Sequence, residues 1–331
     1  IQNRRNFVAD CKKHKRWKLG NQKRAKQKKS EFADVNSGLW AVSPHFRRSV
    51  ETEFKGLESR EIKILVYIWW NDEFEIFRAA MMSLARQGRP VEKSLSWYLL
   101  SLFKWHADTF NAWSHILGFL IFSYFFLLSP LLVSVYTAND ADYDITLFST
   151  RVFTLCISLM YASSVLFHVF WPFSEKVCRK CERLEYCCTV LAIAGTGFPF
   201  TLLTLQGKTI VHCYWVAIVL VSCPAIYLLS HRVVSTENRI SLFIKLMWFI
   251  PVVAVHGIAK HGVFGSRMTS VFYPAVASCS LYALGSFLYA SQFPEKMCPG
   301  KYERFGNSHN IMHGCVLLAT LAHWNIFTSN M

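Results

Sequence analysis

The sequence gives little reason to expect a secretory signal, a disulfide framework or a nucleic-acid-binding motif. Its opening stretch is charged rather than apolar, so no signal peptide is expected. Its eleven cysteines are odd in number and irregularly spaced, which argues against a disulfide scaffold. Basic runs such as CKKHKRWKLGNQKRAKQKK occur without a folded recognition motif, so nucleic acid is not expected as a partner.

Long apolar runs are what the sequence does contain. Of its 331 residues, 53% are hydrophobic, and the mean hydropathy is positive. Windows of about 20 apolar residues predict transmembrane helices. Seven such windows occur, at 112–135, 147–170, 185–206, 210–230, 240–259, 269–292 and 309–328. The sequence therefore predicts an all-α, multi-pass integral membrane protein with a seven-helix transmembrane domain over residues 111–331.

Basic residues are concentrated ahead of the first predicted span and in alternate loops. Residues 1–110 hold 22 Lys and Arg against 12 Asp and Glu. Residues 1–110 and the loops after the second, fourth and sixth spans together hold 31 basic residues. The loops on the opposite side hold three. The positive-inside rule then predicts a cytoplasmic amino terminus and an outside carboxyl terminus. We interpret 1–60 as a basic, disordered cytoplasmic tail, and 61–110 as a cytoplasmic segment with an interfacial helix at 94–105.

Three histidines fall at one predicted depth near the cytoplasmic face. His168 lies near the inner end of the second span, and His309 and His313 begin the seventh. Positions four apart share a helix face, so His309 and His313 can point to a common partner. Three neutral imidazoles suit zinc at about 2.0–2.1 Å and leave a fourth position for water, as in catalytic sites. The alternative is that each imidazole hydrogen-bonds to a neighbouring helix without a metal.

Carboxylate and hydroxyl groups lie near the same predicted depth. Glu185, at the inner start of the third span, is placed to take a proton as a general base. The alternative is that Glu185 and its neighbour Glu182 pair with arginines in a solvated loop. Ser164 lies one turn before His168 and is either a residue that orients substrate or water or an ordinary packing residue. His115 is expected to hydrogen-bond between helices.

Four cysteines form a second, weaker metal candidate. Cys178 and Cys181 make a C-x-x-C pair, but Cys187 and Cys188 are adjacent rather than spaced. Structural zinc is therefore less favoured there than at the histidines.

Three segments resemble the signature segments of the progestin and adipoQ receptor family, closest to the adiponectin receptor branch. They are FNAWSHILGF, SSVLFHVFWPFSEKVCRKCERLEY and FPEKMCPGKYERFGNSHNIMHGCVLLATLAHW, and the resemblance extends from about residue 70 to the end. It implies a zinc ion held by His168, His309 and His313. It also implies that Glu185 takes the place of a third-helix aspartate, and that Ser164 matches a serine one turn before the first ligand.

The resemblance implies a lipid-hydrolysing activity, because members of the family resemble alkaline ceramidases. We therefore predict a zinc-dependent ceramidase that takes part in lipid-metabolic signalling and has ceramide or free fatty acid as its lipid partners. Glu185 in place of aspartate adds a methylene, which can move the carboxylate by about 1 Å and cost about 10²-fold in rate.

A non-catalytic protein is the alternative that the resemblance leaves open. It would be a receptor, a membrane-homeostasis sensor or a scaffold with a structural zinc, binding a cytoplasmic protein through its amino-terminal region. The sequence ends at Met331, soon after the seventh span, so an extracellular hormone is not expected as a ligand. The plasma membrane and the internal membranes of the Golgi or endoplasmic reticulum all remain open as locations.

Overall fold

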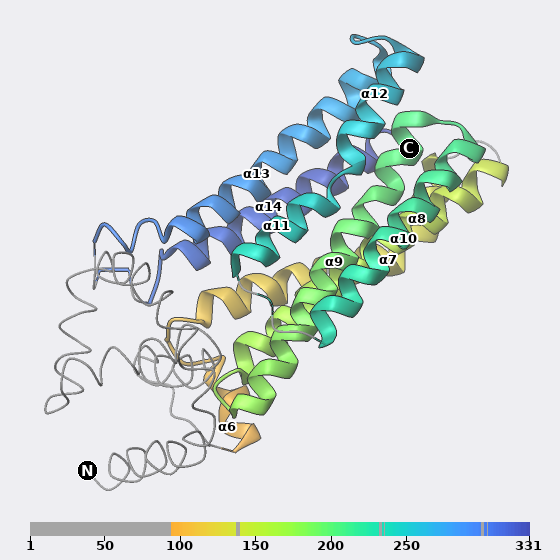
Figure 1. The fold of residues 1–331 in the computed structure, drawn as a ribbon. Helices are drawn as coiled ribbons and strands as arrows, with labels where there is room; N and C mark the ends of the chain where they lie inside the picture. Colours follow the sequence, from red (N-terminus) through yellow and green to blue (C-terminus); the bar gives the residue numbers. More distant parts are fainter. Residues whose placement is uncertain (1–93, 137–139, 232–233, 235, 299–300, 303) are drawn as a thin grey trace, which may run out of the picture. The chain divides into compact units, whose positions relative to one another are not determined.

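A computed structural model describes residues 94–136, 140–231, 234, 236–298, 301–302 and 304–331. The predicted tail at 1–60 and its boundary with the following segment lie outside these residues. Every regular element in the described ranges is a helix (Figure 1). The helices are α6 (Leu95–Ser101), α7 (Thr109–Tyr136), α8 (Asp140–Phe170), α9 (Glu175–Leu205), α10 (Lys208–His231), α11 (Thr236–Leu246), α12 (Phe249–His261), η2 (Met268–Phe272), α13 (Tyr273–Ser291) and α14 (Ser308–Thr328).

Seven helical segments are long and apolar enough to cross a membrane, which confirms the predicted seven-helix transmembrane domain. Five of them are the single helices α7, α8, α9, α10 and α14. The fifth span in chain order joins α11 to α12, and the sixth joins η2 to α13.

The fifth span is interrupted, whereas the sequence predicts one continuous helix at 240–259. Between α11 and α12, Met247 and Trp248 donate to carbonyls only three residues back, at 3.1 and 3.2 Å. Pro251 follows in the first turn of α12, where its missing N–H leaves no helix donor unpaired. The proline therefore fits a helix that restarts at Phe249.

Helix α9 begins ten residues before the predicted third span. Ser174 caps it, because its hydroxyl accepts a 3.3 Å hydrogen bond from the Val177 N–H. The first turns carry charged residues, so a hydropathy window misses them although they are helical. Glu182 and Glu185 consequently lie inside α9 rather than in a loop at its start.

Helix α6 lies within the segment predicted as an interfacial helix. Its outward residues Leu95, Leu99 and Leu100 are about half exposed or more, as expected for a helix that rests on an apolar phase. Its Tyr98 is fully buried and donates a 3.2 Å hydrogen bond to the Pro172 carbonyl in the turn after α8. The helix is therefore anchored beside the end of α8.

The long helices pack lengthwise around a main hydrophobic core, beside which a smaller cluster forms around Val190 and Leu229. Helix α8 packs against both α7 and α9, α10 packs against α9, and α13 packs against α14 (Figure 1). Helix α14 also contacts α7, which brings the last span beside the first. Phe122, Phe153, Tyr161 and Phe327 are fully buried, or nearly so, in this core.

Candidate metal centre

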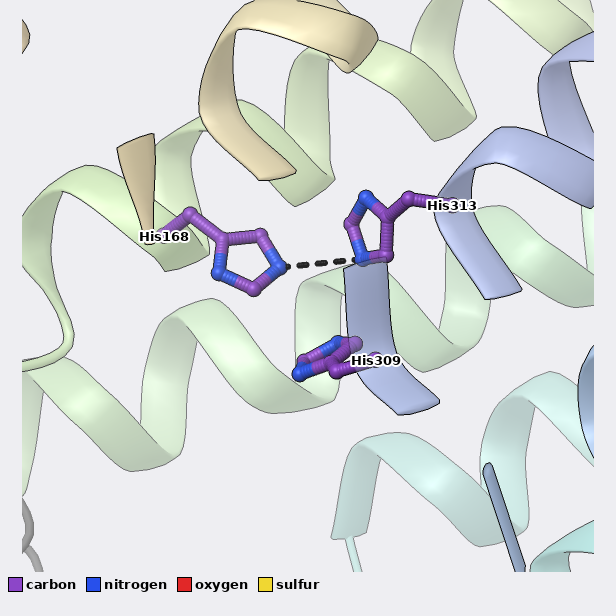
Figure 2. Close-up of side chains that lie close together, drawn as sticks. All are labelled: His168, His309 and His313. Carbon is purple, nitrogen blue, oxygen red and sulfur yellow. Dashed lines mark hydrogen bonds between the residues drawn. The ribbon is translucent and has the colours of Figure 1, made fainter. Parts of the chain in front are cut away.

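Helices α8 and α14 bring the three predicted histidines together. His168 lies in the last turn of α8, and His309 and His313 lie one turn apart at the start of α14. Figure 2 shows the three rings directed at one another across the two helices. Their ligand atoms all lie within 4.8 Å of one another.

The spacing of the imidazoles fits a metal ion. The Nε2 atoms of His168 and His313 are 3.2 Å apart (Figure 2). Two nitrogens at 2.0–2.1 Å from a tetrahedral zinc are about 3.3 Å apart, so this pair already has the required separation. His168 is 1% exposed and His313 is fully buried, so water does not solvate the pair freely. The three rings can therefore hold a metal ion through one nitrogen each.

The first turn of α14 is held by polar contacts that fix both of its histidines. Asn307 caps the helix by accepting a 2.9 Å hydrogen bond from the Asn310 N–H. Glu295 accepts from the Ser308 N–H at 2.8 Å and also from the Ser308 hydroxyl. Because Asn310 donates to the buried Asn111 amide oxygen at 2.8 Å, this turn is also tied to α7.

His115 does not make the interhelical hydrogen bond that the sequence suggested. Its ring stacks on His313, with centroids 3.8 Å apart and planes 27° apart, and meets Tyr161 edge-on at 4.9 Å. Neither of its ring nitrogens has a hydrogen-bond partner among the described residues. The expectation was wrong because the ring lies flat on a candidate ligand instead of pointing to a polar group.

Asp108 is a site residue that the sequence analysis missed. Its Oδ1 lies 3.0 Å from the His168 Nδ1, and its Oδ2 accepts a 2.9 Å hydrogen bond from the Trp171 indole. The available signal was an acid just before the first span, on the same predicted side as His168. Sixty positions separate Asp108 from His168, so no local pattern pairs them.

Glu185 and Ser164 lie near the histidines on neighbouring helices. Ser164, 1% exposed, is on α8 one turn before His168. The Glu185 carboxylate on α9 interacts electrostatically with His168 of α8 and, more weakly, with Arg239 of α11. The Ser164 hydroxyl has no hydrogen-bond partner among the described residues. The two residues predicted to be catalytic thus lie near the three histidines.

Glu182 faces a different partner, one turn before Glu185. It accepts a hydrogen bond from the Tyr186 hydroxyl, and the Arg239 guanidinium lies 4.0 Å from the centre of the Tyr186 ring. Glu182 is buried within α9 rather than solvated in a loop.

The cysteines do not form a second cluster of this kind. Cys178, Cys181, Cys187 and Cys188 are free thiols. Within the part of the chain that the structure describes, the three histidines are the set with metal-site spacing.

Known proteins with similar sequences were found over most of the chain. The family model for haemolysin-III-related proteins matches residues 103–324. The adiponectin receptor protein of Drosophila melanogaster is 27% identical over 257 residues, covering 73% of this chain and 54% of the receptor. The chain therefore spans about half the length of that relative.

Two human proteins match a similar share of this chain and a larger share of their own lengths. The membrane progestin receptor gamma is 25% identical, over 70% of this chain and 72% of its own length. Progestin and adipoQ receptor family member 3 is 28% identical, over 68% of this chain and 73% of its own length. The match over two thirds of the chain, together with these relatives, shows that the chain belongs to the haemolysin-III-related family, among the progestin and adipoQ receptors.

Proposed function

We propose that this protein is a zinc-dependent membrane amidohydrolase that acts on ceramide-like lipids. The observation that carries the proposal is the convergence of His168, His309 and His313 beside the Glu185 carboxylate. Three imidazoles can hold a catalytic zinc and leave one position open for water, and a neighbouring carboxylate can act as the general base.

The histidines would hold the metal, and the remaining groups would move protons and position the substrate. Zinc in such a site supplies Lewis-acid activation of an amide carbonyl and of the attacking water. Glu185 would take a proton from that water and return it to the leaving nitrogen as the C–N bond breaks. The Ser164 hydroxyl would orient the amide or the water between Glu185 and His168.

The surroundings suit a lipid amide better than a soluble one. The site lies among membrane-spanning helices, and a substrate with long acyl chains would enter it from the bilayer. Hydrolysis of a ceramide-type amide adds water across the C–N bond and releases a fatty acid and a sphingoid base. Both products carry apolar chains and remain in the membrane.

Glu185→Gln tests the mechanism, because it keeps the side chain's size and removes its basicity. We expect fatty-acid release from ceramide by purified protein to fall by about 10²–10⁴-fold. Glu182→Gln is the matched control on the same helix, and it should retain nearly all activity because Glu182 faces Tyr186. Equal release by wild type and Glu185→Gln would refute the proposed role of Glu185.

A receptor or scaffold is the second candidate, favoured by the names of the relatives, which are called adiponectin and progestin receptors. In that case the zinc would be structural, and the amino-terminal region would bind a cytoplasmic partner. Glu185→Gln would then leave signalling unchanged, whereas His168→Ala would sharply lower thermal stability. The two candidates are compatible if one site serves both roles.

A further inference from the structure

We infer that Asp108 positions His168 for metal binding and is therefore a part of the metal centre supplied by the segment ahead of α7. This inference rests on the proposed zinc site. It concerns how one ligand is held rather than which residues are ligands.

The two ring nitrogens of His168 have different surroundings. Its Nδ1 lies 3.0 Å from the Asp108 Oδ1, and its Nε2 lies 3.2 Å from the His313 Nε2. A carboxylate only accepts hydrogen bonds, so this contact places the proton of a neutral His168 on Nδ1. The Nε2 lone pair is then left to face the other histidines. Asp108 thus selects the tautomer that can bind a metal.

Asp108 is itself held from two sides. Its second oxygen accepts from the Trp171 indole at 2.9 Å, and Trp171 follows His168 by three residues. One carboxylate therefore bridges two N–H donors at the end of α8. Its own backbone N–H donates to the His106 Nδ1 at 3.2 Å, and the other nitrogen of His106 is 3.0 Å from the Ser101 carbonyl oxygen. These contacts join the end of α6 to the backbone of Asp108.

The two donors make an amide a poor replacement for this carboxylate. In Asp108→Asn, an oxygen turned to His168 would place the NH₂ against the Trp171 N–H. An oxygen turned to Trp171 would place the NH₂ against the His168 Nδ1, which selects the tautomer protonated on Nε2. Removing the indole donor with Trp171→Phe relieves this conflict, because the amide oxygen can then accept from His168.

The test is zinc affinity of the purified full chain, measured by competition with a chromogenic chelator, for wild type, both single variants and the double variant. We expect Asp108→Asn to bind zinc about 10–100-fold more weakly, as for other lost partners of metal-binding histidines. Trp171→Phe should stay within about threefold of wild type, since the His168 contact remains. The double variant should bind zinc more tightly than Asp108→Asn alone.

The four affinities separate the possible outcomes. If Asp108 served only to anchor the fold, the double variant would be worse than either single variant, and the inference would be overturned. Wild-type affinity in Asp108→Asn would overturn it as well. If wild type bound no zinc, the zinc-dependent proposal would fail together with the inference. Thermal unfolding of the zinc-free proteins shows whether each variant is folded. If Asp108→Asn does not fold, Asp108→Glu, which keeps the carboxylate, is compared with Asp108→Ala instead. Asp108→Glu should then bind zinc more tightly than Asp108→Ala.

Discussion

The three candidate ligands differ in their surroundings. His313 is covered by the His115 ring and His168 is paired with Asp108, whereas His309 is only partly buried. The His309 ring lies 5.1 Å from the Tyr289 ring and 5.0 Å from the His168 ring, measured between centroids. Its loss should therefore disturb the packing least while removing one of three ligands.

His309→Ala is expected to abolish zinc retention, because two imidazoles bind zinc far more weakly than three. Elemental analysis of detergent-purified protein should find about one zinc per chain in wild type and almost none in the variant. His212→Ala is the matched control, since His212 is exposed on α10, where its ring contacts the Lys208 carbonyl and the Trp215 ring rather than the three histidines. Zinc in neither wild type nor variant would mean that the three histidines are packing residues.

At the scale of whole elements, the site depends on how closely α7 approaches α8. A side chain at Gly118 of α7 would place its Cβ 2.6 Å from the Tyr161 ring of α8. Tyr161 in turn contacts His115 and shares a 2.6 Å hydrogen bond with the Thr320 hydroxyl of α14. Small residues allow such close contact between membrane helices. Gly118 therefore lets Tyr161 link all three helices beside the histidines.

Gly118→Ala should lower the free energy of unfolding by about 1–3 kcal/mol, because Tyr161 must move to admit the methyl group. Thermal unfolding in detergent would measure the change. Gly314→Ala on α14 is the control, since its Cβ would meet no atom within 4 Å. An alanine there should be neutral or stabilising by up to about 1 kcal/mol. Equal effects of the two substitutions would argue against the close packing at Gly118.

At the scale of the whole molecule, the direction of the seven spans is a prediction from loop charge. It places the loop between α7 and α8 outside and the loop between α13 and α14 in the cytoplasm. The candidate metal centre, at the end of α8 and the start of α14, would then lie near the cytoplasmic face. Products of the proposed hydrolysis would leave at the inner leaflet.

A membrane-impermeant maleimide can test this direction in sealed vesicles of known orientation. We expect Asp142→Cys, at an exposed position in the first turn of α8, to be labelled from the outside more strongly than the native chain. Cys298 is an exposed thiol in the loop between α13 and α14, and it should react only after permeabilisation. The labelling that is lost in a Cys298→Ser variant is the labelling of Cys298. Labelling with the opposite sidedness would reverse the assigned topology.

The sequence by itself determined the seven spans and the common depth of His168, His309 and His313. Both follow from contiguous residues: apolar length sets where a helix crosses, and i, i+4 spacing sets which face a histidine occupies. Local patterns also misplaced two features, because a hydropathy window overlooked the charged first turns of α9 and the break before α12.

Only the tertiary structure decided which groups surround the histidines. The contact of Asp108 with His168 and the stacking of His115 on His313 join residues far apart in the chain. These contacts depend on how α7 is rotated and shifted against α8 and α14. The hydropathy of the α7 sequence does not change with that rotation, so it cannot predict the contacts. The residue types of the centre are thus local properties of the sequence, whereas its hydrogen bonds and ring contacts arise from helix packing.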